Sequence, residues 1–246
     1  MSDSLSERIN KTAKAAVDAT LVPLIGYIRK RLPPAPRVAE DQPQLVAETL
    51  RRAIVDSADY ADANMAAALC FSDKYALWHH AFSLRAIPGL IVEFGVWKAN
   101  STNFFASMTK DVVYGFDSFE GLKEDWAGWS FAKGHFDLGG QLPRVAPNVK
   151  LIKGWFDQSL GAFLAEHPED FSFIHIDCDT YQATKSVLNQ AADRIVPGTV
   201  ALFDEYFGYR GWRIGEYKAW QEFTAARGLK YDYRAFSDQS VVLTVR

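Results

Sequence analysis

The sequence lacks the features that mark several classes of protein. Its 246 residues contain only two cysteines, Cys70 and Cys178, too few for a disulfide framework, and no CxxC pair of the kind that holds a metal. No apolar run approaches the roughly 20 residues that span a bilayer, and the first residues do not have the basic-then-apolar pattern of a signal peptide. Lys and Arg number 27 against 30 Asp and Glu, a net charge of −3, which argues against nucleic acid or an anionic membrane as the main partner. We therefore expect a soluble, cytoplasmic protein.

What is present indicates a globular protein in two parts. The sequence is 48% hydrophobic and 23% charged, as a chain with a sizeable core should be. Residues 1–87 show helical spacing over 1–32, 42–58 and 72–86, with a proline-rich connector at 33–36. The apolar helices before this connector favour a homo-oligomer, a dimer or larger.

From residue 88 onward, short apolar runs alternate with helical patterns. Five runs predict strands, at 90–96, 112–117, 149–154, 171–177 and 199–205, and helices are expected at 101–108, 181–192 and 212–226. Two further runs, 229–236 and 240–246, are joined by a short turn that fits an antiparallel hairpin. The pattern predicts an α/β fold with a mostly parallel, seven-stranded sheet, the topology of Rossmann-like (class I) methyltransferases.

The end of the first of these strands is the first candidate binding site. A dinucleotide site needs GxGxxG there, whereas this chain has Glu93, Gly95 and Trp97 around a single glycine. These residues suit a ligand with an ammonium group and no phosphate, such as S-adenosylmethionine. Glu93 or local carbonyls would hold the ammonium, and Ser101 or Thr102 would bind the carboxylate. The alternative is an ordinary strand-to-helix turn.

The ends of the next two strands add polar and aromatic candidates. Asp117 follows the second strand, where an acidic residue accepts hydrogen bonds from ribose hydroxyls; alternatively it caps a helix. Trp155 and Phe156 follow the third strand, where they would sandwich an adenine ring or, alternatively, belong to the core.

Carboxylates gather after the fourth and fifth strands. Asp177 and Asp179 follow one, Asp204 and Glu205 the other, and neighbouring strands place these ends close together. Carboxylates this close together repel one another unless a hard cation such as Mg²⁺ binds them. We call these four residues the acid group. Our ligand set is Asp177, Asp204 and Glu205.

Two alternatives to this metal set stay open. Asp179 is expected to cap the following helix beside Thr180. The acids could also pair with Arg210 or Arg213, with no metal bound.

Methyl transfer to a hydroxyl also needs a general base. His135 lies in an aperiodic, aromatic-rich stretch after the second strand that could cover an acceptor, and we assign it as the base; alternatively it is an ordinary loop histidine. His175 is mid-strand and is expected in the core.

Five motifs in order carry a resemblance to a known family. VEFGVWKANST, GFDSFEGL, KGWFDQSL, IHIDCDTY and ALFDEYFGYRGWR resemble the macrocin O-methyltransferases, metal-dependent class I S-adenosylmethionine enzymes that methylate sugar hydroxyls of natural products. The resemblance covers about residues 88–246 and implies that residues 1–87 form a helical cap and oligomerisation segment. Cofactor positions then fall on Glu93, Gly95, Trp97, Ser101, Asp117, Ser118 and Trp155.

The same resemblance assigns the remaining site residues. Asp177, Asp204 and Glu205 match the family's metal triad, although many members have Asp where this chain has Glu205. His135 falls near the family's base histidine, and we place Asp177 in the catalytic and cofactor-binding groups as well.

Other functions remain open at this point. A catechol or another small diol presents the same two oxygens to a metal as a sugar does. A binding protein that kept the fold and lost the chemistry is a second alternative, since fold alone does not establish function. An NAD-dependent dehydrogenase is disfavoured by the missing glycines.

Overall fold

The structure, a computed structural model, describes residues 44–246, of which Leu45–Arg246 form one compact unit. The predicted helix over 1–32 and the connector after it lie outside the described residues. The predicted boundary at 87/88 does not coincide with the start of this unit. The helices are α2 (Leu45–Asn64), α3 (Lys74–Ser83), α4 (Asn100–Ser107), α5 (Phe156–Glu166), α6 (Tyr181–Gln190) and α7 (Glu216–Arg227), with short 3₁₀ turns at Ala192–Arg194 and Trp212–Ile214.

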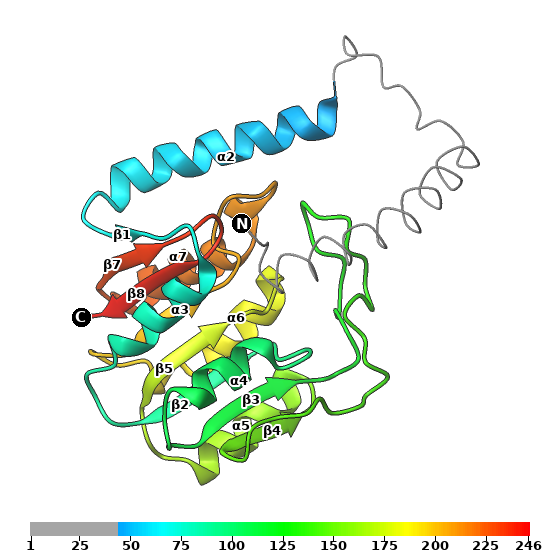
Figure 1. Cartoon of the computed structure of the whole chain (residues 1–246), viewed down its shortest axis with the longest axis vertical. Helices are drawn as coiled ribbons and strands as arrows, with labels where there is room; N and C mark the ends of the chain where they lie inside the picture. Colours follow the sequence, from blue (N-terminus) through cyan, green and yellow to red (C-terminus); the bar gives the residue numbers. More distant parts are fainter. Residues whose placement is uncertain (1–43) are drawn as a thin grey trace, which may run out of the picture. The chain divides into compact units, whose positions relative to one another are not determined.

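One sheet runs through the unit (Figure 1). Its strands are β1 (Leu69–Cys70), β2 (Leu90–Phe94), β3 (Val113–Asp117), β4 (Val149–Lys153), β5 (Phe171–Ile176), β6 (Val200–Phe203), β7 (Tyr231–Phe236) and β8 (Val241–Val245). They lie in the order β1-β7-β8-β6-β5-β2-β3-β4, and β8 alone runs antiparallel to its neighbours. The α/β class, the five parallel strands and the terminal hairpin are confirmed.

Helices cover both faces of the sheet, as its sequence requires. All six residues of β5 and all five of β2 are buried, which explains their almost continuous apolar runs. Helices α3 and α4 pack on one face through Leu77, Trp78 and Phe105. Helices α5, α6 and α7 contribute to the core on the other face (Figure 1).

Two elements differ from the prediction. The sheet has eight strands rather than seven, because β1 pairs with β7 over two residues, Leu69 with Ala235 and Cys70 with Phe236. A two-residue strand has no periodicity that a sequence pattern could reveal. Helix α5 follows β4 directly and was not among the predicted helices.

Helix α2 is attached to the loop after β6. Ser57 Oγ accepts a hydrogen bond from the backbone N–H of Gly208 at 2.9 Å, and the Asp56 carboxylate pairs with Arg213 at 2.7 Å. The Tyr60 hydroxyl shares a hydrogen bond with the Tyr233 hydroxyl at 2.7 Å. None of the helices within residues 44–246 combines the length and apolar character needed to cross a membrane.

Candidate active site

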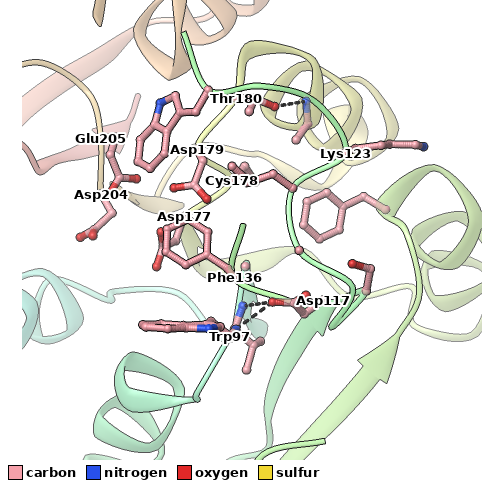
Figure 2. A pocket seen from close by; sticks show the side chains of 18 of the residues that line it. Trp97, Asp117, Lys123, Phe136, Asp177, Cys178, Asp179, Thr180, Asp204 and Glu205 are labelled. Atoms are coloured by element: carbon pink, nitrogen blue, oxygen red, sulfur yellow. Dashed lines mark hydrogen bonds between the residues drawn. The ribbon is translucent and has the colours of Figure 1, made fainter. Parts of the chain in front are cut away.

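A cavity of about 680 Å³ opens at the carboxyl ends of the parallel strands (Figure 2). This is the edge where an open α/β sheet binds ligands. The residues predicted to form the site line this cavity, apart from Glu93 and His135: they are Gly95, Trp97, Ser101, Asp117, Ser118, Trp155, Phe156, Asp177, Asp204 and Glu205.

The turn after β2 is held by Asp117. One oxygen of the Asp117 carboxylate accepts from the backbone N–H groups of Val96 at 2.9 Å and Trp97 at 2.8 Å, and the other accepts from Phe119 at 2.7 Å. A long loop, not a helix, follows Asp117, so the helix-cap alternative is wrong. A carboxylate has about four lone-pair sites, so Asp117 keeps acceptor capacity toward the cavity.

Gly95 is required at this turn for two reasons. Its φ is +96°, in the left-handed region, and a Cβ built on it would lie 1.8 Å from the carbonyl oxygen of Asp177. The turn after β2 and the loop after β5 are therefore in direct contact. A larger residue would push the two loops apart.

The structure decides between two hydroxyls at the start of α4. Ser101 lines the cavity. The hydroxyl of Thr102 instead donates to the Glu93 carboxylate within the protein. Of the two predicted carboxylate binders, Ser101 is the one placed at the cavity.

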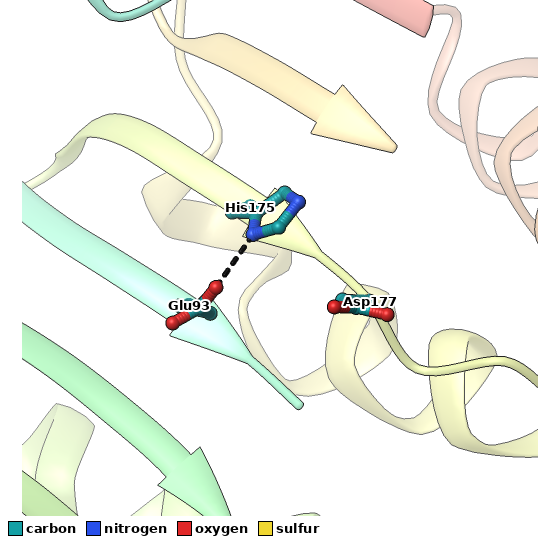
Figure 3. Close-up of side chains that lie close together, drawn as sticks. All are labelled: Glu93, His175 and Asp177. Atoms are coloured by element: carbon teal, nitrogen blue, oxygen red, sulfur yellow. Dashed lines mark hydrogen bonds and ion pairs between the residues drawn. The ribbon is translucent and has the colours of Figure 1, made fainter. Parts of the chain in front are cut away.

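The prediction that Glu93 contacts the ligand is not supported. Its side chain is 1% exposed and makes a 2.7 Å hydrogen bond to Nδ1 of His175 (Figure 3), and neither residue lines the cavity. His175 is fully buried, as expected for a core residue. Its Nε2 lies 3.9 Å from an Asp204 oxygen, so it reaches the acid group from below.

The pKa values of His175 and its carboxylate neighbours depend on the charges around them. Burial by itself would lower the pKa of His175, but the carboxylates of Asp204 and Glu93 raise it to about 10. Burial would likewise raise the pKa of Asp204, yet His175 and the Ser240 hydroxyl, 3.0 Å from its Oδ1, lower it. His175 thus favours the ionised form of Asp204.

The acid group forms as predicted, with a different closest set. Asp177, Asp179 and Glu205 each offer an oxygen, and these oxygens lie within 4.8 Å of one another. Burial, followed by repulsion from neighbouring carboxylates, raises the pKa of all three. Figure 2 shows Asp177, Asp179, Asp204 and Glu205 together on one side of the cavity.

The expectation that Asp179 caps the next helix is wrong. Thr180 is the N-cap of α6, and its side chain accepts from the backbone N–H of Ala183. Asp179 adopts a φ of +63°, unusual for a residue other than glycine, and lines the cavity. Its carboxylate accepts no hydrogen bond from residues 44–246.

Arginine does not neutralise the acid group as one alternative supposed. Arg213 pairs with Asp56 on α2, through hydrogen bonds of 2.8 and 2.7 Å. Among the ion pairs of residues 44–246, none joins Arg210 to the four carboxylates. Lys74, which the sequence analysis did not single out, lines the cavity and lowers the pKa of Asp204.

His135 is not where a base would need to be. The residue is exposed, its ring stacks on Phe131 with centroids 4.3 Å apart, and it packs edge-on against Phe136. The two phenylalanines line the cavity while His135 does not, and within residues 44–246 no histidine does. The loop does carry an aromatic wall, in which Phe136 packs against Trp97 at 5.2 Å.

Trp155 and Phe156 occupy the boundary between core and cavity. Trp155 is the N-cap of α5 and Phe156 its first residue, and both line the cavity. Phe156 also packs edge-on against Phe94 in the core, with centroids 5.7 Å apart. Phe156 therefore belongs to the core, as the alternative supposed, and also contributes to the cavity wall.

Sequence reasoning missed one residue behind the acid group. Glu216, the first residue of α7, is 0% exposed, and burial raises its pKa to about 8. It lies 11 residues beyond Glu205, after an irregular loop. No motif marks it, so no signal in the sequence could have found it.

Comparison with known proteins identifies the domain that holds this site. Residues 92–206 match the family described as a methyltransferase domain. The chain thus resembles this family over 115 of its 246 residues. The matched range begins in β2 and ends just after β6, and so includes the turn after β2 and the acid group.

Two sugar O-methyltransferases are related in sequence. A tetracenomycin-C rhamnosyl 4'-O-methyltransferase of Streptomyces olivaceus is 28% identical over 144 residues, 49% of this chain and 54% of that protein. Mycinamicin III 3''-O-methyltransferase of Micromonospora griseorubida is 28% identical over 145 residues, which are 49% of this chain and 56% of that protein. The alignments thus span about half the length of these relatives. The resemblance to the macrocin type is confirmed.

Solved structures confirm the class I methyltransferase fold. The calicheamicin methyltransferase CalS11 superposes with a TM-score of 0.58 at 19% identity, over 83% of this chain and 93% of CalS11. The O-methyltransferase NovP gives a TM-score of 0.52 at 17% identity, over 70% of this chain and 78% of NovP.

Proposed function

We propose that the methyltransferase domain transfers the methyl group of S-adenosylmethionine to a hydroxyl of a sugar or glycoside, with a divalent cation such as Mg²⁺ in the acid group. One observation carries this proposal: the turn after β2 and the acid group are in contact and line a single cavity. A methyl donor bound at the turn would meet an acceptor bound at the acids.

The cofactor would lie across the turn after β2. Gly95 allows it to approach the backbone, Ser101 offers a hydroxyl to its carboxylate, and Asp117 keeps acceptor capacity for the ribose. Trp155 and Phe156 flank the position for adenine. With Glu93 buried, backbone carbonyls at the turn are left to bind the ammonium.

The donors at the acid group fit a hard cation. Glu205 is 8% exposed and its Oε2 has no hydrogen-bond partner within residues 44–246. Asp177, Asp179 and Glu205 each place an oxygen within 4.8 Å of the others, and carboxylate oxygens are the ligands that a hard cation such as Mg²⁺ prefers. Asp177 and Glu205 belong to both the predicted and the observed groups, and Asp204 completes the predicted set. When bound, the cation would neutralise these charges and lower the pKa of an acceptor hydroxyl.

Asp179 replaces His135 as our candidate base. Its carboxylate lines the cavity beside Asp177, without a hydrogen bond from residues 44–246. Burial makes the largest contribution to its raised pKa, and a raised pKa strengthens a carboxylate as a proton acceptor. Trp97 and Phe136, which pack together as an aromatic wall, line the same cavity as the acids. Such a wall suits the C–H face of a sugar ring.

The sugar class is supported by the tetracenomycin relative, whose name places a rhamnosyl group on its substrate, and the second relative is by name an O-methyltransferase of mycinamicin III. Because each alignment covers about half of either protein, the acceptor remains our proposal for this chain.

The first experiment is calorimetric binding of S-adenosylhomocysteine, with and without Mg²⁺, followed by mass-spectrometric assay of methyl transfer. Rhamnosides and nucleotide-linked deoxysugars serve as acceptors, a catechol as the competing class, and EDTA removes the cation. We expect binding, and EDTA-sensitive transfer to a sugar. Transfer to the catechol alone would replace the sugar with a small diol. Binding without transfer to any diol would favour a silent binding protein, and undiminished turnover in EDTA would remove the cation.

A homo-oligomer and a cytoplasmic location stay predictions. Helix α2 offers exposed apolar side chains to a partner, among them Val46 at 71% and Ile54 at 51% exposure. Light scattering on the full chain measures the oligomeric state directly.

A further inference from the structure

Glu216 joins the two loops that carry the acid group. Its Oε1 accepts a hydrogen bond from the backbone N–H of Cys178 at 3.0 Å, and its Oε2 accepts from the backbone N–H of Glu205 at 3.3 Å. The side chain is fully buried at the first turn of α7. One carboxylate thus bridges a residue after β5 and a residue after β6.

Both bonded N–H groups are next to acids of the site. Cys178 stands between Asp177 and Asp179, and Glu205 is itself one of the four carboxylates. The sheet pairing of β5 with β6 ends at Ile176 and Phe203. Beyond that point the two loops need another tie to keep their carboxylates in register, and Glu216 supplies it.

Stability alone does not account for a carboxylate here. A negative charge at the start of α7 is favoured by the helix dipole, but an exposed position would give that benefit without desolvation. Glu216 instead lies buried near other carboxylates, and Asp204 repels it. Burying an acid among acids is costly, and the contacts that Glu216 makes in return are its two hydrogen bonds to the loops that carry the acid group.

We propose that Glu216 is a positioning residue, which sets the spacing of the loop that carries Asp177 against the loop that carries Glu205, two of the proposed ligands, and so the affinity of the site for a divalent cation. This inference rests on the proposed function, since it assumes that the acid group binds a cation. Outer partners that orient metal ligands typically change metal affinity about 10–100-fold when replaced. We expect that range here.

The test compares Glu216→Gln with Glu222→Gln in the full chain. Glutamine keeps one oxygen acceptor, but its NH₂ faces the second N–H, so one of the two ties is lost. Glu222 is on the same helix, with a side chain 46% exposed, and it bonds Lys218 and Tyr181 on the surface. Mn²⁺ affinity is measured by electron paramagnetic resonance and S-adenosylhomocysteine affinity by calorimetry.

We expect Glu216→Gln to bind Mn²⁺ about 10–100-fold more weakly, with S-adenosylhomocysteine affinity unchanged, and Glu222→Gln to match the wild type in both. Loss of both affinities in Glu216→Gln would indicate general damage to the fold and overturn the inference. Unchanged Mn²⁺ affinity would overturn the inference alone. If the wild type itself binds no Mn²⁺, the cation in the proposed function fails and the inference falls with it.

Hydrogen exchange decides the matter if Glu216→Gln does not fold. The N–H groups of Cys178 and Glu205 lie in loops, outside the strand ladders, and both donate to Glu216. Slow exchange of both in the wild type supports the tie. Exchange at the rate of an open loop overturns it.

Discussion

The α-carbon of Gly95 faces the backbone of Asp177 with no room for a side chain, since a Cβ would lie 1.8 Å from the Asp177 carbonyl oxygen. This contact joins the turn after β2 to the loop after β5. It brings the proposed donor and acceptor regions together without a linking segment, so one residue controls both their approach and the shape of the cavity.

Replacing Gly95 with alanine should therefore damage the site as well as the fold. The φ of +96° and the backbone clash force the turn to move, at a cost of about 1–3 kcal/mol in the free energy of unfolding. We expect S-adenosylhomocysteine affinity to fall at least tenfold. Gly139→Ala is the control, because this glycine also has a positive φ, +62°, but open space around it. Equal cofactor affinity in the two variants would contradict the contact's role.

The buried Glu93–His175 pair should act on stability and not on direct cofactor contact. Removing one member leaves an unpaired buried charge, which typically costs about 3–5 kcal/mol. We expect Glu93→Ala to lower the free energy of unfolding by that amount in urea titration. Asp193→Ala, which breaks a surface pair with Arg227, should cost about 0–1 kcal/mol. A Glu93 variant of normal stability that fails to bind cofactor would restore the ligand contact first expected from the sequence.

Substitutions at Asp179 and His135 test which of the two residues is the general base. If Asp179 accepts the acceptor's proton, Asp179→Asn should lower kcat about 10²–10⁴-fold, while His135→Ala, outside the cavity, should stay within about threefold of the wild type. Single-turnover assays with saturating acceptor measure both. The reverse ranking would show that the loop carries His135 into the cavity during the reaction.

The sequence predicted those parts of the fold that have a strong local signal. Buried strands such as β5 appear as unbroken apolar runs, and the hairpin has its short turn. Strand β1 has two residues and exists only through its pairing with β7, a contact between segments far apart in the chain. No local pattern contains that information.

In the site, too, the sequence predicted the features that depend on neighbouring residues and missed those that depend on residues far apart in the chain. The acids were predicted because each directly follows a strand. What each acid does depends on residues distant in sequence: Glu93 is turned inward by His175, 82 positions away, and Glu216 meets Cys178 across 38 positions. The N-cap of α6 was assigned to Asp179 instead of Thr180 because only backbone geometry, a φ of +63° at Asp179, distinguishes the two residues.

Mg²⁺ should stabilise the protein through the acid group. Ligand present at a hundred times its Kd adds about 2.7 kcal/mol to the stability, so the wild type should melt several degrees higher with Mg²⁺. Burial, and after it repulsion from neighbouring carboxylates, raises the pKa of Asp177 and Glu205, so removing one charge lessens the repulsion when no cation is bound. Glu205→Gln should thus melt higher than the wild type in EDTA, yet gain less from Mg²⁺.

That pair of opposite shifts is specific to a cation site. A carboxylate that only stabilised the fold would lower the melting temperature in both buffers when replaced by glutamine. Glu222→Gln, on the surface of α7, should leave the Mg²⁺ response of the wild type intact. Differential scanning calorimetry of the three proteins, each in EDTA and in Mg²⁺, measures all six melting temperatures. An equal Mg²⁺ response in Glu205→Gln and wild type would place the cation elsewhere.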